Sequence, residues 1–90
     1  MEAHDFSWAL RKIKEGHKVS REGWNGKGMF VFLVPESEFK VNRPPLLGIY
    51  DEGTDIKYQA HIDMRTADGT IVPWLASQSD LLSLDWEVVS

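Results

Sequence analysis

The stretch His61–Asp80, HIDMRTADGTIVPWLASQSD, decides the fold, and the strand leading into it is the clearest element of the chain. From Ile56 to Thr66 the residues alternate in character. One side carries Ile56, Tyr58, Ala60, Ile62, Met64 and Thr66, and the other carries Lys57, Gln59, His61, Asp63 and Arg65. Successive side chains of a strand point to opposite faces, so this segment predicts a strand with an apolar back and a charged, hydrogen-bonding front.

A tight hairpin is expected directly after this strand. Asp68-Gly69 supplies two residues that tolerate positive φ, which is typical of a two-residue hairpin loop. A loop of that length would place Trp74 opposite Asp63. The indole would then share a face with His61, Asp63 and Arg65, and an aromatic plate beside donors and acceptors favours a surface for a small molecule.

Length and composition predict one small domain, residues 1–90. The chain is 42% hydrophobic and 27% charged, as in ordinary globular proteins. A chain of this size buries only about 60–65% of its unfolded surface, so a sizeable pocket forms more easily between subunits than inside one. There is no cysteine, which excludes a disulfide framework and a thiolate metal site and favours a cytoplasmic location.

Charge and hydropathy exclude two kinds of partner. The N-terminus lacks the pattern of a signal peptide, and no segment approaches the roughly 20 apolar residues of a membrane span, so we expect no membrane contact. The net charge of −4 disfavours a nucleic acid polymer, because such binding depends on Lys and Arg neutralising phosphates. A small anionic ligand needs only a few local donors and remains compatible.

The first half of the chain predicts a helix and several strands. Asp5 is placed to cap a helix whose apolar residues recur at helical spacing from Phe6 to Ile13, and Gly16 is placed to end it. Lys18–Arg21 predicts a short strand. A second strand is expected at Met29–Val34, which is apolar throughout and should be covered on both sides, by a helix or by another subunit.

The second half completes an α+β pattern. Phe39–Arg43 predicts an edge strand, and the loop Pro44–Tyr50 carries apolar groups whose exposure is unexpected unless they pack on a partner. Ser77 and Asp80 form a weak capping-box pattern before a short helix with leucines on one side, and Asp85–Val89 predicts a last strand. We therefore expect an α+β fold: a small, mainly antiparallel sheet with an N-terminal helix and a short C-terminal helix.

The glycine-rich run Gly23–Gly28 has two interpretations. It can be a hairpin turn with an anchoring tryptophan, which spacing alone favours because glycine clusters usually mark turns. Alternatively, its glycines let a ligand approach main-chain N–H groups closely.

The polar residues support binding better than catalysis. His61 and Asp63 could reach one metal ion, but no second His or Cys accompanies them, so we expect no metal and no cofactor. Ser77 and Ser79 lack the surroundings of an activated nucleophile. Nucleotide binding has fewer requirements than catalysis. It needs aromatic rings for stacking, cations for phosphate and polar groups for ribose hydroxyls and base edges. Those groups are Trp24 and Trp74; Lys27, Arg43 and Arg65; and Asn25, Asn42, Asp63 and Gln78. The alternative is that both tryptophans are core residues.

Three runs of sequence resemble the phage-encoded Thoeris anti-defence proteins of the second family. They are GWNGKGM (Gly23–Met29), FKVNRPPLLG (Phe39–Gly48) and HIDMRTADGTIVPWLASQSDLLSLDW (His61–Trp86). The likeness extends over about the whole chain. It implies a non-enzymatic protein that binds a cyclic nucleotide immune signal in the host cytoplasm during infection. The signal best known for the family is glycocyclic ADP-ribose, and some relatives take cyclic di- or trinucleotides. The resemblance also implies a homo-oligomer, typically a tetramer, with ligand pockets shared between subunits.

Several expected ligand-binding residues lie at positions of these motifs. They are Trp24, Asn25, Gly26, Asn42, Arg43, His61, Asp63, Met64, Trp74, Gln78 and Asp80. Their assignment rests on side-chain chemistry, not on the resemblance. Arg65 stands where relatives often have lysine, which keeps the charge and adds bidentate geometry. Two other functions stay open: an enzyme that cleaves such a nucleotide, with His61 as acid or base and Asp63 orienting it, and an interaction module without a small ligand.

Overall fold

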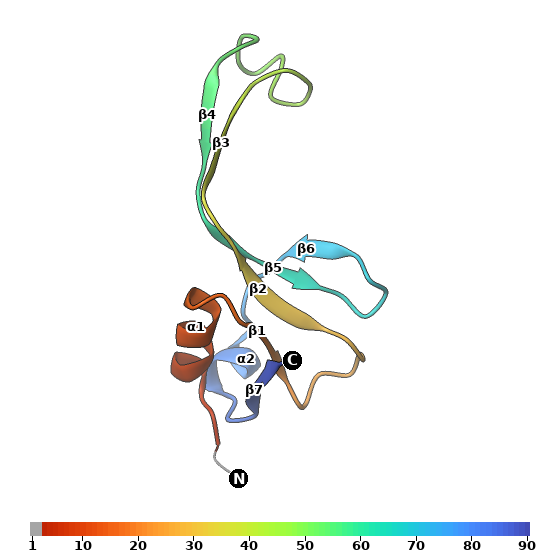
Figure 1. The fold of residues 1–90 in the computed structure, drawn as a ribbon. Helices are drawn as coiled ribbons and strands as arrows, with labels where there is room; N and C mark the ends of the chain where they lie inside the picture. The colour runs from red at the N-terminus through yellow and green to blue at the C-terminus, as the bar shows by residue number, and fades with distance from the viewer. Residues whose placement is uncertain (1–2) are drawn as a thin grey trace.

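One long β-hairpin forms the axis of the molecule in the computed structural model, which describes residues 3–90 (Figure 1). In chain order the elements are α1 (Phe6–Lys14), β1 (Lys18–Arg21), β2 (Phe30–Val34), β3 (Ser37–Lys40), β4 (Asp55–Tyr58), β5 (His61–Arg65), β6 (Ile71–Pro73), α2 (Gln78–Leu82) and β7 (Trp86–Val89). Five strands form an antiparallel sheet in the order β6-β5-β2-β1-β7, and β3 pairs with β4 in a separate two-stranded sheet. The expected α+β class and mainly antiparallel sheet are confirmed.

The second sheet is an arm that continues the hairpin beyond the body of the molecule. Val34 pairs with His61 and Ser37 pairs with Tyr58, so β2–β5 and β3–β4 keep one register. Pro35 lies between the two pairs and has no N–H to donate to the ladder. The single strand expected over residues 56–66 is therefore two strands, β4 and β5.

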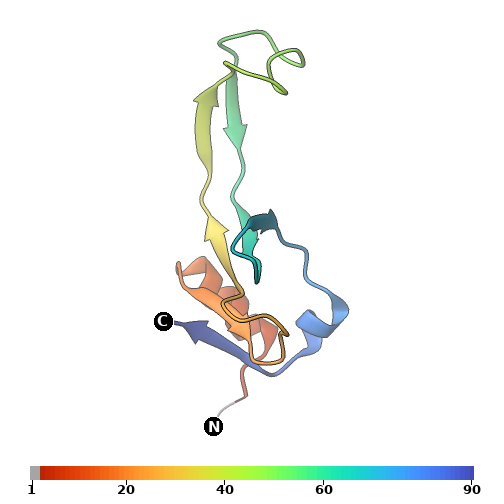
Figure 2. The ribbon, with the colours of Figure 1, turned by 90° about the vertical axis from the view of Figure 1, so that its right-hand side faces the viewer.

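The arm gives the chain an elongated shape, 53 × 25 × 25 Å (Figure 2). Its radius of gyration is 16.2 Å, against about 12 Å for a compact domain of this length.

The core lies where α1 covers one face of the five-stranded sheet. Its fully buried residues are Ala9, Ile13, Val19, Val31 and Trp86. The helix begins as expected, because the Asp5 side chain accepts a hydrogen bond from the Trp8 N–H at 2.9 Å. It ends before Gly16, which has φ +97°.

Strand β2 is covered by this chain on one face only. Val31 is buried beneath α1, whereas Phe30, Phe32 and Val34 alternate onto the opposite face and are only partly buried. The expectation of cover on both sides is met on the helix side, and within residues 3–90 no second layer packs over the other face.

The hairpin loop after β5 has three residues, not the expected two. The Thr66 N–H donates to the Thr70 carbonyl at 2.8 Å, and Gly69 takes a φ of +90°. The Asp68 carboxylate accepts hydrogen bonds from Thr66 and Thr70, which closes the longer loop.

This extra residue reverses the expected position of Trp74. Asp63 pairs with Pro73, and the Trp74 N–H donates to the Ile62 carbonyl at 3.0 Å. A shift of one residue moves every side chain to the other face of a strand. Trp74 therefore lies on the core side, with its ring 6.1 Å from those of Phe6 and Trp86, and the prediction that it shares a face with His61 and Asp63 was wrong.

Helix α2 begins with the expected capping box. The Ser77 hydroxyl accepts from the Asp80 N–H, and the Asp80 carboxylate accepts from the Ser77 N–H, both at 3.0 Å. The leucines expected to give this helix an apolar side are exposed, and the helix ends at Leu82, before the last of them: Leu81, Leu82 and Leu84.

Candidate ligand-binding surfaces

The uncovered face of the sheet combines aromatic and charged side chains. Three cross-strand pairs form it, namely Phe30–Arg65, Phe32–Asp63 and Val34–His61. We call these six residues the open face. Its residues His61, Asp63 and Arg65 belong to the charged face that the alternation of residues 56–66 predicts, and this face points away from α1.

His61 and Asp63 are held close together on the open face. The His61 Nε2 atom lies 3.7 Å from an Asp63 carboxylate oxygen, and its Nδ1 atom lies 3.0 Å from the Gln59 carbonyl. The Tyr58 ring, at the base of the arm, lies 4.8 Å from the imidazole. Only 18% of the Asp63 side chain is exposed, so the carboxylate is largely covered by its neighbours on the open face.

Arg65 joins the open face to the glycine-rich loop. Its guanidinium donates to the Gly28 carbonyl at 2.8 Å. Gly28 has φ +78°, a backbone conformation that favours glycine, and a Cβ at this position would push the Arg65 guanidinium aside. A guanidinium has five N–H donors, which leaves others for a ligand.

Two phenylalanine rings provide flat apolar area next to these charges. Phe30 and Phe32 lie 5.8 Å apart, and the Lys18 ammonium lies 5.0 Å from the Phe30 ring. A face with aromatic plates, a carboxylate and cations can stack a planar base and hydrogen-bond to hydroxyls and phosphates.

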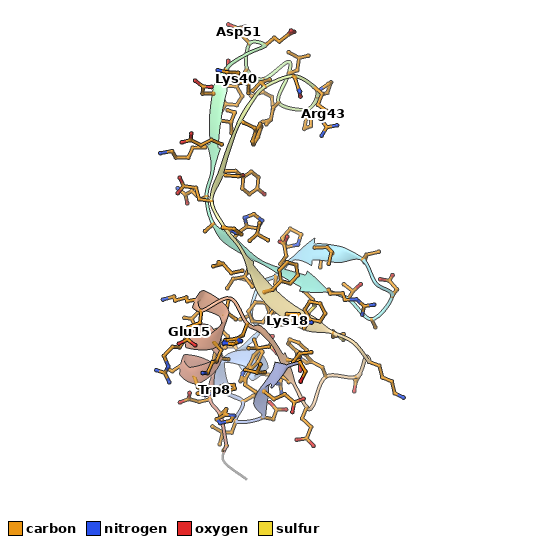
Figure 3. All side chains as sticks on the ribbon, viewed as in Figure 1. Trp8, Glu15, Lys18, Lys40, Arg43 and Asp51 are labelled. Atoms are coloured by element: carbon orange, nitrogen blue, oxygen red, sulfur yellow. The ribbon has the colours of Figure 1, made fainter. Side chains whose placement is uncertain are left out.

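A second candidate surface lies at the tip of the arm. A hollow of about 410 Å³ is lined by Phe39, Lys40, Val41, Asn42, Arg43, Pro44, Pro45 and Leu46. This volume falls in the range of small-molecule sites. Figure 3 shows Arg43 at the tip, far from the body. Within one chain, Asn42 and Arg43 are therefore not brought together with His61 and Asp63.

Trp24 anchors the glycine-rich loop to the body. Its indole N–H donates to the Asp80 carboxylate at 3.2 Å, and its ring packs edge-on against Trp86 with centroids 5.3 Å apart. This geometry supports the interpretation of the run as a turn with an anchoring tryptophan.

A partly buried ion-pair network completes this anchor. Arg21 donates to Asp80 at 2.9 Å and to Asp85 at 3.0 Å, and the second Asp85 oxygen accepts from the Gly23 N–H at 2.8 Å. Arg21 and Asp85 were not predicted from the sequence. The available signal was an arginine at the end of a strand beside a glycine-rich loop, but its partners lie 59 and 64 residues away.

Hydrogen bonding lowers the pKa of both aspartates in this network. Burial alone would raise the pKa of Asp80, but donors from Ser77, Arg21 and Trp24 outweigh it. For Asp85, burial is likewise outweighed by the Arg21 hydrogen bond and the Gly23 N–H. The network raises the pKa of Arg21, since the aspartates outweigh the opposing effect of burial.

We expect the free energy of unfolding to fall as the pH drops below 3.8, the ordinary aspartate value. In that range the unfolded chain binds more protons than the folded one, so stability is full above the ordinary pKa and is lost as pH falls through the lowered values. Urea titrations from neutral to acidic pH measure this. The Asp80→Asn variant should show a flatter acid limb, and an equally steep limb would contradict the assignment.

The other expected site residues occupy different surroundings. Asn25 is exposed in the glycine-rich loop, and Gln78 is exposed at the first position of α2. Gly26 packs so tightly that an added Cβ would lie 2.6 Å from the Ala67 Cβ. Met64 lies on the core face with Trp74. Ligand contacts by any of these residues remain predictions.

Residues 3–90 contain neither a metal-binding cluster nor a membrane-spanning helix. That part of the chain contains no group of three or more His, Asp or Glu side chains able to hold a metal ion. None of its helices has the length and apolar character needed to cross a membrane.

The fold and the open face place the chain in the class of small α+β proteins with a half-uncovered sheet. The chain belongs to the family of Thoeris anti-defense 2-like domains, whose sequence model matches residues 4–89. It is 38% identical over 85 residues to Thoeris anti-defense 2 of Bacillus phage SP01, a match that covers 94% of this chain and 93% of that protein. The resemblance seen in the sequence is thus confirmed, and the chain takes its place among phage anti-defence proteins.

Proposed function

We propose that the protein counters bacterial defence by sequestering a cyclic nucleotide signal without cleaving it. The proposed ligand is glycocyclic ADP-ribose, and the alternatives are cyclic di- and trinucleotides. Family membership over residues 4–89, together with an open face suited to a nucleotide, carries this proposal.

The open face matches the parts of such a ligand. Phe30 and Phe32 offer rings for stacking a purine, Asp63 can accept hydrogen bonds from ribose hydroxyls, and Lys18 and Arg65 can pair with phosphate oxygens. None of the six open-face residues is a serine or a cysteine. The open face therefore favours ligand binding over covalent catalysis.

We further propose that the protein acts as a homo-oligomer, expected to be a tetramer. One chain separates the arm tip from the open face and leaves one side of β2 uncovered, so a second copy is needed to enclose a ligand. Light scattering coupled to size-exclusion chromatography measures the mass directly.

Replacing Asp63 by asparagine should weaken binding of glycocyclic ADP-ribose by roughly ten- to a hundredfold, as expected for one lost hydrogen bond to a charged group. Titration calorimetry measures the dissociation constant, which for a sequestering protein should be nanomolar, about −12 kcal/mol. The matched control is Asp55→Asn, since Asp55 is a solvated carboxylate on the arm that should leave binding unchanged. Equal affinity of the Asp63→Asn variant and the unmodified protein would remove the open face from the proposal.

The same ligand separates sequestration from hydrolysis, the alternative supported by the 3.7 Å contact of His61 with Asp63. The protein is incubated with glycocyclic ADP-ribose and denatured by heat, and the supernatant is analysed by chromatography. Intact ligand is expected, whereas a degraded product would establish the enzyme. If calorimetry detects no heat of binding with any cyclic nucleotide tested, the remaining hypothesis is an interaction module without a small ligand.

A further inference from the structure

The arm has one charged face and one apolar face. Its charged face pairs Glu38 with Lys57 and Lys40 with Asp55 across the two strands. These groups satisfy one another, with nitrogen–oxygen distances of 3.7 Å and 2.7 Å. The charged face is therefore suited to solvent.

The opposite face of the arm is apolar and has no cover. Phe39 pairs with Ile56 and Ser37 pairs with Tyr58, and these residues form what we call the arm patch. The side chains of Phe39 and Tyr58 are 40% and 51% exposed. By pairing register, Ser37 and Phe39 alternate in phase with the core-face residue Val31, while the Tyr58 ring reaches His61 at the edge of the open face.

Helix α1 covers that core face in the body but does not extend along the arm. It packs on β1, β2 and β7, and both ribbon views show the arm standing clear of it (Figures 1 and 2). An isolated two-stranded ribbon is marginally stable at best in water. The arm patch therefore needs a cover that is present whenever the protein is folded, and a second copy of the chain meets that condition.

Three surfaces of a second copy could cover the arm patch: the open face, the exposed leucines Leu81, Leu82 and Leu84 of the body, and the arm patch itself. The open face is a poor cover, since burying it under aromatic rings would desolvate the charges of Asp63 and Arg65. The arm patch of the second copy has no charged member, so packing patch against patch desolvates no charge; the Ser37 and Tyr58 hydroxyls are its polar groups. Contact of identical surfaces also closes with two-fold symmetry, whereas arm-to-body contact in one direction can continue into open chains.

We propose that the arms of two copies pack face to face through their arm patches, Phe39 and Tyr58 of each copy at the centre. This rests on the oligomer proposed above and specifies the surface that forms it. Half-exposed aromatic residues contribute roughly 100 Å² each, and a stable interface needs about 800 Å² per partner. The arm patch alone supplies only part of that area, so the contact must also involve neighbouring exposed apolar residues of the arm, of which Ile49 and Tyr50 at the tip are candidates.

Single cysteines test this contact cleanly, because the chain contains none of its own. Cysteine is placed in turn at Ser37, Phe39, Ile56 and Tyr58 in the full chain, and each variant is treated with a bismaleimide spanning about 10 Å, the spacing of packed sheets. We expect covalent dimers on a denaturing gel for positions in the arm patch. The matched controls are Glu38→Cys and Lys57→Cys, which lie on the charged face of the same strands and should stay monomeric.

Light scattering on the Phe39→Asp/Tyr58→Asp variant gives the second measurement. We expect the mass to fall by a factor of two with the circular dichroism spectrum retained. An oligomer of unchanged mass, with cross-linking no stronger in the arm patch than on the charged face, would overturn the arm contact while leaving the proposed oligomer standing. A monomeric unmodified protein would overturn both, and calorimetry with glycocyclic ADP-ribose would still report on ligand binding separately.

Discussion

The Trp86→Ala variant is expected to lose roughly 3–5 kcal/mol of unfolding free energy, the usual cost of removing a large core aromatic residue. Trp86 is 2% exposed and packs against the rings of Phe6, Trp24 and Trp74. Its indole N–H also donates to the Asp80 carbonyl at 3.0 Å. A domain of this size has only about 5–13 kcal/mol in total, so this single change removes a large share of the stability.

Thermal unfolding at a fixed protein concentration measures this effect, because association would otherwise shift the midpoint. The midpoint should fall by more than about 12 °C for a loss of this size. The matched variant is Trp86→Phe, which keeps most of the apolar area and loses the hydrogen bond to Asp80, and it should be clearly less destabilised. A midpoint within a few degrees of the unmodified protein for Trp86→Ala would show that the core does not centre on this ring.

The Arg21→Ala variant is expected to lose about 3 kcal/mol, because it leaves two aspartates without their cation. The Arg21 and Asp80 side chains are only 17% and 10% exposed, so solvent replaces the lost contacts poorly. The Gly23–Gly28 loop should loosen as well, since Asp80 and Asp85 hold Trp24 and the Gly23 N–H.

Urea unfolding of Arg21→Ala provides the measurement, and Lys12→Ala provides the control. Lys12 pairs with Glu15 at 3.5 Å on the exposed side of α1, where an ion pair contributes less than about 1 kcal/mol. Similar losses for the two variants would mean that burial adds nothing to the Arg21 network.

The sequence by itself determined the elements whose signals are local. Hydrogen bonds between near neighbours define the cap at Asp5 and the capping box of Ser77 and Asp80, and both follow from spacings of three residues. The alternation of residues 56–66 likewise indicated the charged face that carries His61 and Asp63. The sequence also carried the motifs that identify the family.

Only the tertiary structure decided which face each half of the hairpin presents. One extra loop residue, closed by Asp68, moved Trp74 from the expected open side to the core. Hairpin register depends on a small difference in turn energy, and Asp-Gly is compatible with loops of two and of three residues.

The uncovered arm and the Arg21 network could not be predicted from the sequence either, and the reason is the same for both. Phe39 lies in phase with core residues, and only the place where α1 ends leaves it bare. Arg21 meets Asp85 across 64 residues of chain. Periodicity records which side of an element is apolar, whereas packing in three dimensions decides what covers that side and which distant charges meet.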